Sequence, residues 1–394
     1  MNVILYDNNR INYYPLSLTR PIAYFRVGIL TIKEKWNIYY DSVSVKTEAY
    51  LATKYPINVL NDNLWINASI LPSEELITEL KNLRVGEGLS KNGQVFAFRS
   101  NDFDIDKLNI IDSHAQFSVL EKISDIFSLN GQQIKNDMKI MGMLKMEWMG
   151  DKKILEDIKD SNIKIGNHPI YIEDGAKLQH SILNTSDGPI YIGKDAEIME
   201  GSMIRGPFAM GQNSVVKMGT KIYGATTLGP YCKVGGELNN VVLFGYSSKS
   251  HDGFLGNSVL GEWCNLGAGT NISNLKNNYA DVRLWNYSSE RFENTALQFC
   301  GLIMGDHSKS SINTMFNTGT VVGVSANIFG AGFPRNFIPS FSWGGSKGFM
   351  IYKLSKMYNV ASKVFSRRGV EFSKIEEDIL LEVYNLTKRY RNEV

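Results

Sequence analysis

The feature that most constrains this chain is a six-residue repeat of aliphatic side chains in its middle third. Eight consecutive positions at this step are aliphatic: Ile192, Ile198, Ile204, Met210, Val216, Ile222, Leu228 and Val234. A strand repeats every two residues and a helix every 3.6, so neither accounts for a six-residue step. Such repetition is typical of a parallel β-helix in which one aliphatic side chain per six residues points inward.

The repeat loses its phase twice. After the first break the frame resumes at Leu260, Leu266 and Ile272, and after the second at Met304, Phe316, Val322 and Ile328. Ser310 is the one polar residue at a position of this frame. Insertions in a solenoid become surface loops, often on the binding face. We therefore predict surface insertions at about 236–259 and 275–303, with His251 in the first, and we look for function there.

The first part of the chain has a different pattern. The segments 3–6 and 64–67 are short apolar runs that predict buried strands, and Pro72 and Ser73 mark the start of a helix over 72–83. Alternating strands and helices indicate an α/β, Rossmann-like domain with a parallel sheet.

The pattern divides the chain into four parts. We expect an α/β domain over 1–125, a helical linker over 126–164, a β-helix over 165–345 and two C-terminal helices over 346–394.

Composition excludes several classes of function. The formal net charge is +2 without a long run of one sign, so nothing indicates nucleic-acid or membrane-surface binding. No run of roughly 18 apolar residues predicts a membrane span, and the N-terminus lacks the features of a signal peptide. Three cysteines without CxxC spacing fit a reducing compartment, so we expect a cytoplasmic protein.

The segment 251–271, HDGFLGNSVLGEWCNLGAGTN, carries a resemblance to a known family. It resembles the acetyltransferase segment of the bifunctional glucosamine-1-phosphate N-acetyltransferase / N-acetylglucosamine-1-phosphate uridylyltransferase family. The domain arrangement and the C-terminal helices resemble the Bacteroidetes-type branch of that family. In that family a histidine precedes an aromatic-Leu/Val-Gly step and then N-[IF]-G-A-G-T. The resemblance implies a left-handed β-helix, acetyl-CoA as co-substrate, a hexosamine-1-phosphate as acceptor and a homotrimer.

The resemblance also implies roles for individual residues. His251 takes the position of the general base, a role that suits imidazole near neutral pH. Backbone amides near Ala268 and Gly269 would hold the thioester oxygen of acetyl-CoA. Three groups of residues complete the expected site: Asn265 and Asn274 for the sugar, Lys249 and Lys276 for its phosphate, and His307 beside the coenzyme. The family's tyrosine three residues after the histidine is Phe254 here.

The segment 13–21, YYPLSLTRP, resembles the signature of sugar-1-phosphate nucleotidyltransferases, in which Arg20 would contact a phosphate. The residues before it contain no glycine, although that family places a glycine-rich phosphate loop there. Ile22 stands where the family has lysine, and Ser69 where it has a metal-binding aspartate. Mg²⁺ remains a candidate cofactor with unknown ligands, Asp7 and Asp62 being weak candidates, and we expect uridylyl transfer to be slow, absent or carried by other groups.

Three functions therefore stay open. The first is a trimeric acetyltransferase acting on a hexosamine-1-phosphate. The second adds nucleotidyl transfer, to N-acetylglucosamine-1-phosphate or to another sugar. The third is a non-catalytic trimeric scaffold or sugar-nucleotide sensor, which would not need His251 at its spacing from the GAGT segment.

Overall fold

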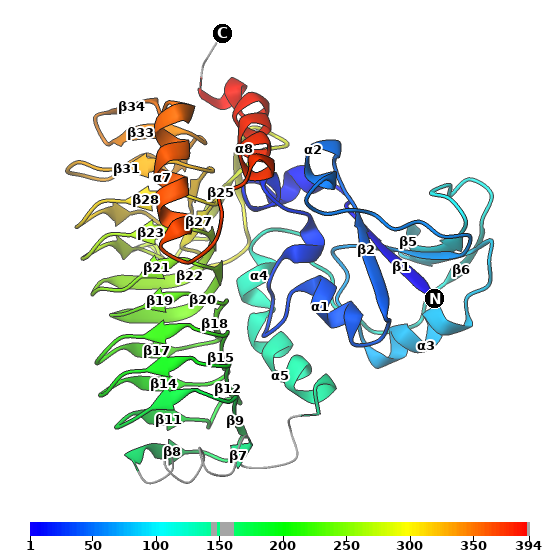
Figure 1. The fold of residues 1–394 in the computed structure, drawn as a ribbon, viewed down its shortest axis with the longest axis horizontal. Coiled ribbons are helices and arrows are strands. Elements are labelled where there is room, and N and C mark those ends of the chain that lie inside the picture. The colour runs from blue at the N-terminus through cyan, green and yellow to red at the C-terminus, as the bar shows by residue number, and fades with distance from the viewer. Residues whose placement is uncertain (143–147, 150–160, 392–394) are drawn as a thin grey trace. The chain divides into compact units, whose positions relative to one another are not determined.

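The computed structural model describes residues 1–142, 148–149 and 161–391 (Figure 1). The chain divides into two compact units. The first, called the sheet unit below, consists of Met1–Tyr13, Thr19–Phe25 and Leu30–Ile123. The second, called the solenoid unit, consists of Tyr14–Leu18, Arg26–Ile29 and Ser124–Val394.

The sheet unit contains a six-stranded sheet in the order β2–β1–β3–β5–β4–β6. Its strands are β1 (Asn2–Tyr6), β2 (Ser42–Lys46), β3 (Asn63–Asn67), β4 (Glu87–Lys91), β5 (Gln94–Ser100) and β6 (Asn109–Asp112). The strands β1, β2 and β3 are parallel, while β5 runs antiparallel to both β3 and β4. The predicted strands at 3–6 and 64–67 are therefore confirmed as β1 and β3, in a Rossmann-like sheet.

Short helices connect these strands. They are α1 (Ile32–Asn37), α2 (Ala49–Ala52), α3 (Glu74–Asn82) and the 3-10 turns Arg10–Tyr13 and Ile22–Tyr24. The predicted helix over 72–83 is α3, and Ser73 caps it by accepting a hydrogen bond from the amide of Leu76 at 3.2 Å. This cap satisfies one of the amides that the first helical turn leaves without a partner.

The solenoid unit is a left-handed parallel β-helix whose coils each pass through three ladders of short strands. Ladder A contains β8 (Ile163–Ile165), β11 (Ile182–Asn184), β14 (Met203–Arg205), β17 (Lys221–Tyr223), the first parts of β20 (Glu237–Gly245) and β22 (Phe254–Glu262), then β24 (Asn271–Ile272) and β29 (Met315–Phe316). Ladder B contains β7 (Trp148–Met149), β9 (Ile170–Ile172), β12 (Ile190–Ile192), β15 (Phe208–Met210), β18 (Thr226–Leu228), the second parts of β20 and β22, then β27 (Leu302–Met304), β30 (Thr320–Val322) and β32 (Phe337–Ile338). Ladder C contains β10 (Lys177–Leu178), β13 (Glu197–Ile198), β16 (Val215–Val216), β19 (Lys233–Val234), β21 (Ser248–Lys249), β23 (Asn265–Leu266), β28 (Lys309–Ser310), β31 (Asn327–Ile328), β33 (Ser342–Gly345) and β34 (Gly348–Ile351).

The aliphatic repeat forms the interior of this prism, as predicted. All eight positions from Ile192 to Val234 are at most 2% exposed and belong to one core cluster. Parallel pairing places equivalent residues of successive coils in register, for example Ile198 with Val216 and Val216 with Val234.

The corner that precedes ladder C has a constant backbone conformation. The residue three positions before each inward side chain has a positive φ, between 54° and 63°, at Asp195, Asn213, Tyr231, Tyr246, Trp263, His307, Ser325 and Phe341. Non-glycine residues rarely adopt this left-handed conformation, and asparagine, aspartate and histidine tolerate it best. A six-residue repeat therefore reflects a strand of fixed length followed by a corner of fixed turn.

The prediction of a surface loop at about 236–259 is wrong. This segment forms two ordinary coils, because β20 and β22 pair in parallel from Glu237 with Phe254 to Gly245 with Glu262. The phase is lost because corners are shortened: the inward side chains Val234 and Leu238 are four residues apart, and Leu238 and Leu243 are five apart. The coils therefore continue without interruption, although their inward side chains are no longer six residues apart.

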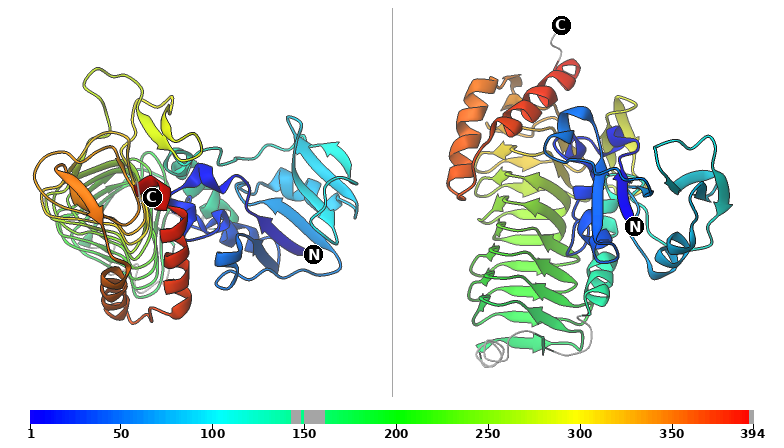
Figure 2. Two further views of the ribbon diagram at one scale, coloured as in Figure 1. Left: turned by 90° about the horizontal axis from the view of Figure 1, so that it is seen from above. Right: turned by 45° about the vertical axis from the view of Figure 1, so that its right-hand side comes forward.

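The second interruption is an excursion, as expected. Between β24 and β27 the chain forms an antiparallel hairpin of β25 (Arg283–Asn286) and β26 (Arg291–Asn294). The yellow segment projects from the coils in the left panel of Figure 2.

The expected helical linker is only partly helical. It contains α4 (Asp125–Ser128) and α5 (Asn130–Ile140), and the Asn130 side chain ties α5 to the solenoid by donating to the Ala225 carbonyl at 3.0 Å. The strand β7 also lies in this segment and pairs with β9. Residues 143–147 and 150–160 of the expected linker lie outside the described residues.

Two C-terminal helices follow the solenoid, as predicted: α7 (Leu354–Ser366) and α8 (Lys374–Leu386). The remaining 3-10 turns are Leu16–Leu18 and Lys388–Arg391. No helix within residues 1–142, 148–149 and 161–391 is both long and apolar enough to span a bilayer. All three cysteines are buried thiols and none forms a disulfide.

Candidate functional site

Two corners of successive coils bring the expected catalytic residues together. The His251 corner (residues 250–253) follows β21, and the Ala268 corner (residues 267–270) follows β23. The amide of Gly269 donates to the Asp252 carbonyl at 3.0 Å. The contact leaves no room for a larger residue at Gly253, because a Cβ there would lie 2.1 Å from the Thr270 carbonyl oxygen. The two corners therefore form one continuous edge of the prism.

His251 is exposed on this edge. Its imidazole has no hydrogen-bond partner among the residues that the structure describes, so both ring nitrogens are open to a ligand. Imidazole exchanges a proton readily near neutral pH, which is the property that a general base requires. The sequence indicated that His251 lies in a surface insertion, but the structure places it at a corner of the solenoid.

Lys249 points into the prism and not toward solvent. It pairs in register with Val234 and is 1% exposed. Its amine donates to the Gly235 carbonyl at 2.9 Å and to the His251 carbonyl at 2.6 Å. Desolvation lowers the pKa of this amine to about 8, although the nearby charge of Asp252 opposes the shift. The amine thus forms its hydrogen bonds within the solenoid. The expected contact of Lys249 with a sugar phosphate does not agree with this placement.

Ser310 is a second polar residue at an inward position of ladder C. Its hydroxyl lies 3.0 Å from the Thr270 hydroxyl and accepts from the amide of Gly267 at 3.3 Å. Lys249 and Ser310 flank the aliphatic Leu266 in the ladder. Buried polar groups are costly unless they are hydrogen-bonded. Both side chains direct their polar atoms to the two corners of the site.

The two backbone amides expected to bind the thioester oxygen differ in whether another group of the chain already accepts a hydrogen bond from them. The amide of Gly269 is already occupied by the Asp252 carbonyl. The amide of Ala268 has no acceptor in the described part of the chain, and Ala268 is half-buried. Ala268 is therefore the residue whose amide remains available for a substrate oxygen, a distinction that the sequence does not contain.

Asn265 and Asn274 lie on the outside of the solenoid, on either side of the Ala268 corner. Asn265 is exposed on β23, in register with Ser248. The Asn274 amide nitrogen donates to the Asn257 side chain at 2.7 Å and lies close to Gly256, beside the ring of Phe254. Asn274 is thus on the outer face of β22, the strand that begins just after the His251 corner.

Lys276 does not reach the His251 corner in this arrangement. Its amine donates to the Asp281 carbonyl at 2.6 Å, within the excursion. It lines a separate cavity with residues of the β25–β26 hairpin.

His307 is one of the left-handed corner residues of ladder C, with φ 63°, and is 7% exposed. Its ring is near-parallel to the rings of Trp263 and Phe365, with centroids 6.5 and 5.8 Å away. Trp263 also stacks on Phe365 of α7, at 3.9 Å, and on Tyr246, at 4.2 Å. The structure thus gives His307 a place in the stack that attaches α7 to the solenoid.

In the sheet unit, the carboxyl ends of β1 and β3 meet at the point where the strand order reverses, a typical ligand position in α/β sheets. The Asp7 carboxylate there accepts from the Ile22 amide at 2.9 Å and from the Thr47 hydroxyl at 2.6 Å. Burial raises the pKa of Asp7, against the opposing effect of Arg10. Arg20, in the segment between β1 and β2, is 4% exposed.

The two candidate metal ligands do not fit a Mg²⁺ site. Asp7 pairs with Arg10 at 3.5 Å, and Asp62 forms a two-point contact with Arg99 at 2.8 and 2.6 Å. Mg²⁺ requires carboxylate oxygens that are free to coordinate it. Among the described residues, no three His, Cys, Asp or Glu side chains cluster as a metal site would require.

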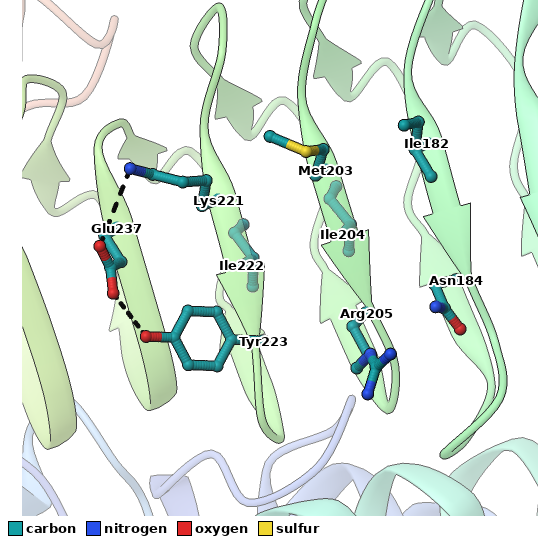
Figure 3. A pocket seen from close by; sticks show the side chains of 9 residues that line it. All are labelled: Ile182, Asn184, Met203, Ile204, Arg205, Lys221, Ile222, Tyr223 and Glu237. Carbon is teal, nitrogen blue, oxygen red and sulfur yellow. Dashed lines mark hydrogen bonds and ion pairs between the residues drawn. The ribbon is translucent and has the colours of Figure 1, made fainter.

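A shallow hollow of about 390 Å³ lies on the outer face of ladder A (Figure 3). Met203 is 45% exposed there and Tyr223 is 37% exposed. Glu237 accepts from the Tyr223 hydroxyl at 2.5 Å and pairs with Lys221 at 3.8 Å. The face combines exposed apolar side chains with paired charges, as many protein–protein contact surfaces do.

The chain thus combines a Rossmann-like sheet unit with a parallel β-helix that has an exposed histidine on its edge. Comparison with known proteins shows what this chain resembles. Residues 3–143 match the family described as Sugar nucleotidyl transferase. A "Bifunctional sugar-1-phosphate nucleotidylyltransferase/acetyltransferase" of Sulfurisphaera tokodaii is 29% identical over 164 residues, which are 40% of this chain and 37% of that relative.

The chain thus matches little more than a third of the length of this curated relative. Among solved structures, a hexapeptide transferase family protein from Anaplasma phagocytophilum shares 13% identity, with 59% of this chain and 90% of that chain covered. The TM-score of this match is 0.20.

Proposed function

We propose that this protein transfers the acetyl group of acetyl-CoA to the amino group of a hexosamine-1-phosphate, with glucosamine-1-phosphate as the first candidate. The observation that carries the proposal is the edge formed by the His251 and Ala268 corners. It combines an open imidazole and an open backbone amide on corners joined by a 3.0 Å hydrogen bond.

The reaction assigns one task to each group. The amine nitrogen attacks the thioester carbonyl carbon, and His251 accepts the proton that the amine loses. The amide of Ala268 donates to the carbonyl oxygen as that oxygen gains negative charge. The carbon–sulfur bond then breaks, and the thiolate of coenzyme A leaves and takes up a proton. The amide product and free coenzyme A balance the reaction.

Lys249 serves this proposal as a positioning residue. Its amine joins the carbonyls of Gly235 and His251, so it fixes the His251 corner from inside the prism. On the outer face of β22, Asn274 would contact the sugar, and Asn265 lies on the neighbouring ladder.

The sheet unit supports a second candidate activity, nucleotidyl transfer to a sugar-1-phosphate. The match of residues 3–143 to Sugar nucleotidyl transferase favours it. The glycine-free segment after β1 and the arginine-paired state of Asp7 and Asp62 oppose it. The buried Arg20 remains the expected phosphate contact.

Release of free thiol from acetyl-CoA tests the first activity, with glucosamine-1-phosphate, galactosamine-1-phosphate and glucosamine as acceptors. We expect turnover with the amino-sugar phosphates and much less with glucosamine. A second assay supplies N-acetylglucosamine-1-phosphate, each nucleoside triphosphate and Mg²⁺, and measures pyrophosphate. Absence of turnover in both would favour the scaffold or sensor instead.

A further inference from the structure

The excursion between β24 and β27 walls a cavity of about 660 Å³ within the solenoid unit. Its residues come from the loop after β24, from both strands of the hairpin, from the loops before β30 and β32, and from β32 itself. Three cations and three aromatic rings dominate the lining, which includes no carboxylate: Lys276, Arg283, Arg335, Trp285, Phe292 and Phe337.

Within the part of the chain that the structure describes, no acidic side chain forms an ion pair with any of these three cations. The Arg283 guanidinium donates to the Phe292 carbonyl on the opposite strand, with Nε at 3.2 Å, and the Lys276 amine donates to the Asp281 carbonyl. Both partners are neutral backbone groups, which orient the cations and leave their charge intact. Arg335 is exposed and has no ion pair with any residue that the structure describes.

The aromatic rings form a rigid wall beside these charges. Trp285 stacks on Phe337 at 4.2 Å with an interplanar angle of 10°, and Phe292 meets Trp285 edge-on at 5.4 Å. All three rings are half-buried. The indole nitrogen of Trp285 is shielded from solvent, and no residue that the structure describes forms a hydrogen bond with it.

We propose that this cavity binds a phosphorylated nucleoside. Arginine and lysine bind phosphate oxygens, and arginine can do so through two parallel hydrogen bonds. Half-exposed aromatic faces accept a planar base by stacking. The volume lies in the range of small-molecule sites and exceeds what a phosphate ion alone would fill.

The proposal goes beyond acetyl transfer and does not depend on it, because the cavity contains neither His251 nor Ala268. Two ligands could supply a phosphorylated nucleoside to this cavity. One is the adenosine 3′,5′-bisphosphate end of coenzyme A, and the other is a free or sugar-linked uridine diphosphate. Both present a base and phosphates, and the binding experiment separates them.

Isothermal titration calorimetry on the full chain tests the site with adenosine 3′,5′-bisphosphate, uridine diphosphate, adenosine and inorganic phosphate. We expect at least one nucleotide to bind at least ~10-fold more tightly than adenosine or phosphate, because only it uses both the cations and the rings. Arg335→Glu should weaken that binding by about 10-fold or more. Lys347→Glu, the same charge reversal at an exposed lysine of the β33–β34 turn, should leave it unchanged. Trp285→Leu should weaken nucleotide binding and leave phosphate binding as it is.

Preference for the adenosine bisphosphate would identify the coenzyme as the source, and preference for uridine diphosphate would identify the nucleotide. Three results would overturn the proposal: no binding, phosphate binding as tight as nucleotide binding, or nucleotide binding insensitive to Arg335→Glu in a folded variant. The last result would assign the nucleotide to another part of the chain. None of these results bears on the acetyl-transfer assay.

Discussion

Lys249 stands where the repeat places an aliphatic side chain, between Val234 and Leu266 of ladder C. Its carbon chain fills the apolar prism while its amine leaves the core at the corner, where two carbonyls accept from it. Long basic side chains can combine apolar and polar surroundings in this way. The family resemblance implied instead that Lys249 would contact the sugar phosphate. Only the shortened corners, which put Lys249 in phase with the core, account for its inward direction.

Lys249→Met should separate positioning from folding. Methionine keeps an apolar chain of similar length but leaves the carbonyls of Gly235 and His251 without a donor. We expect kcat for acetyl transfer to fall about 10-fold, with little change in KM for acetyl-CoA. Lys233→Met, at the outward position of the adjacent strand β19, is the matched control. An unchanged kcat in folded Lys249→Met would show that the amine does not position His251.

The same lysine predicts a pH dependence of stability. The pKa of Lys249 is lowered from 10.5 to about 8 in the folded chain. Between these values the unfolded chain holds a proton that the folded chain has lost, so the free energy of unfolding should rise with pH. Below about pH 8 both states are protonated and the rise is absent.

Urea denaturation of wild type and Lys249→Met at pH 7, 8, 9 and 10 measures this contribution as a difference. The subtraction is needed because burial also lowers the pKa of Lys309 to about 8. A difference between the two proteins that stays constant over this range would contradict the placement of the amine.

At the scale of elements, the sequence predicts the coils well and the corners poorly. The aliphatic step identifies the interior because each strand must bury one side chain, which is a local rule. Corner lengths depend on backbone turns, so Leu238 and Leu243 fall out of a strict six-residue count while remaining in the core. For the same reason the site was only partly predictable: the proximity of His251 to Ala268 follows from coil stacking, but the occupied amide of Gly269 does not.

Ile222→Asp tests the interior of the β-helix. Ile222 is 2% exposed between Ile204 and Leu238, so an aspartate there would be an unpaired carboxylate in an apolar core. We expect a loss of more than about 4 kcal/mol in the free energy of unfolding, or no folded protein. Lys221→Ala, the outward neighbour on β17, should change stability by less than about 1 kcal/mol. Similar stability of the two variants would contradict the inward direction of Ile222.

At the scale of the molecule, different observations support the proposed activity of each unit. The sheet unit has the family match, and the solenoid unit has the edge that holds His251. We propose a homotrimer, and the exposed apolar side chains on the outer face of ladder A support contact between copies of the chain. The sequence alone does not mark this face, because its exposed residues alternate with core residues in the same strands.

Met203→Glu tests the assembly. The side chain is 45% exposed at the hollow of ladder A (Figure 3), so a charge there should not disturb the core. Light scattering coupled to size-exclusion chromatography should give a trimer mass for the wild type and a smaller species for the variant. Met218→Glu, at a residue 70% exposed on a corner, is the control. A monomeric wild type, or a trimer that tolerates Met203→Glu, would contradict contact through this face.

The central claim is that His251 removes the amine proton during acetyl transfer, and the turnover of His251→Ala tests it most directly. With glucosamine-1-phosphate and acetyl-CoA, we expect kcat to fall by a factor on the order of 10²–10⁴, the usual contribution of a positioned acid–base group. Coenzyme affinity and circular dichroism should stay unchanged, since the side chain is exposed. His180→Ala, at another exposed corner histidine of the solenoid, should keep wild-type turnover. A folded His251→Ala that retains most of its turnover would contradict the account.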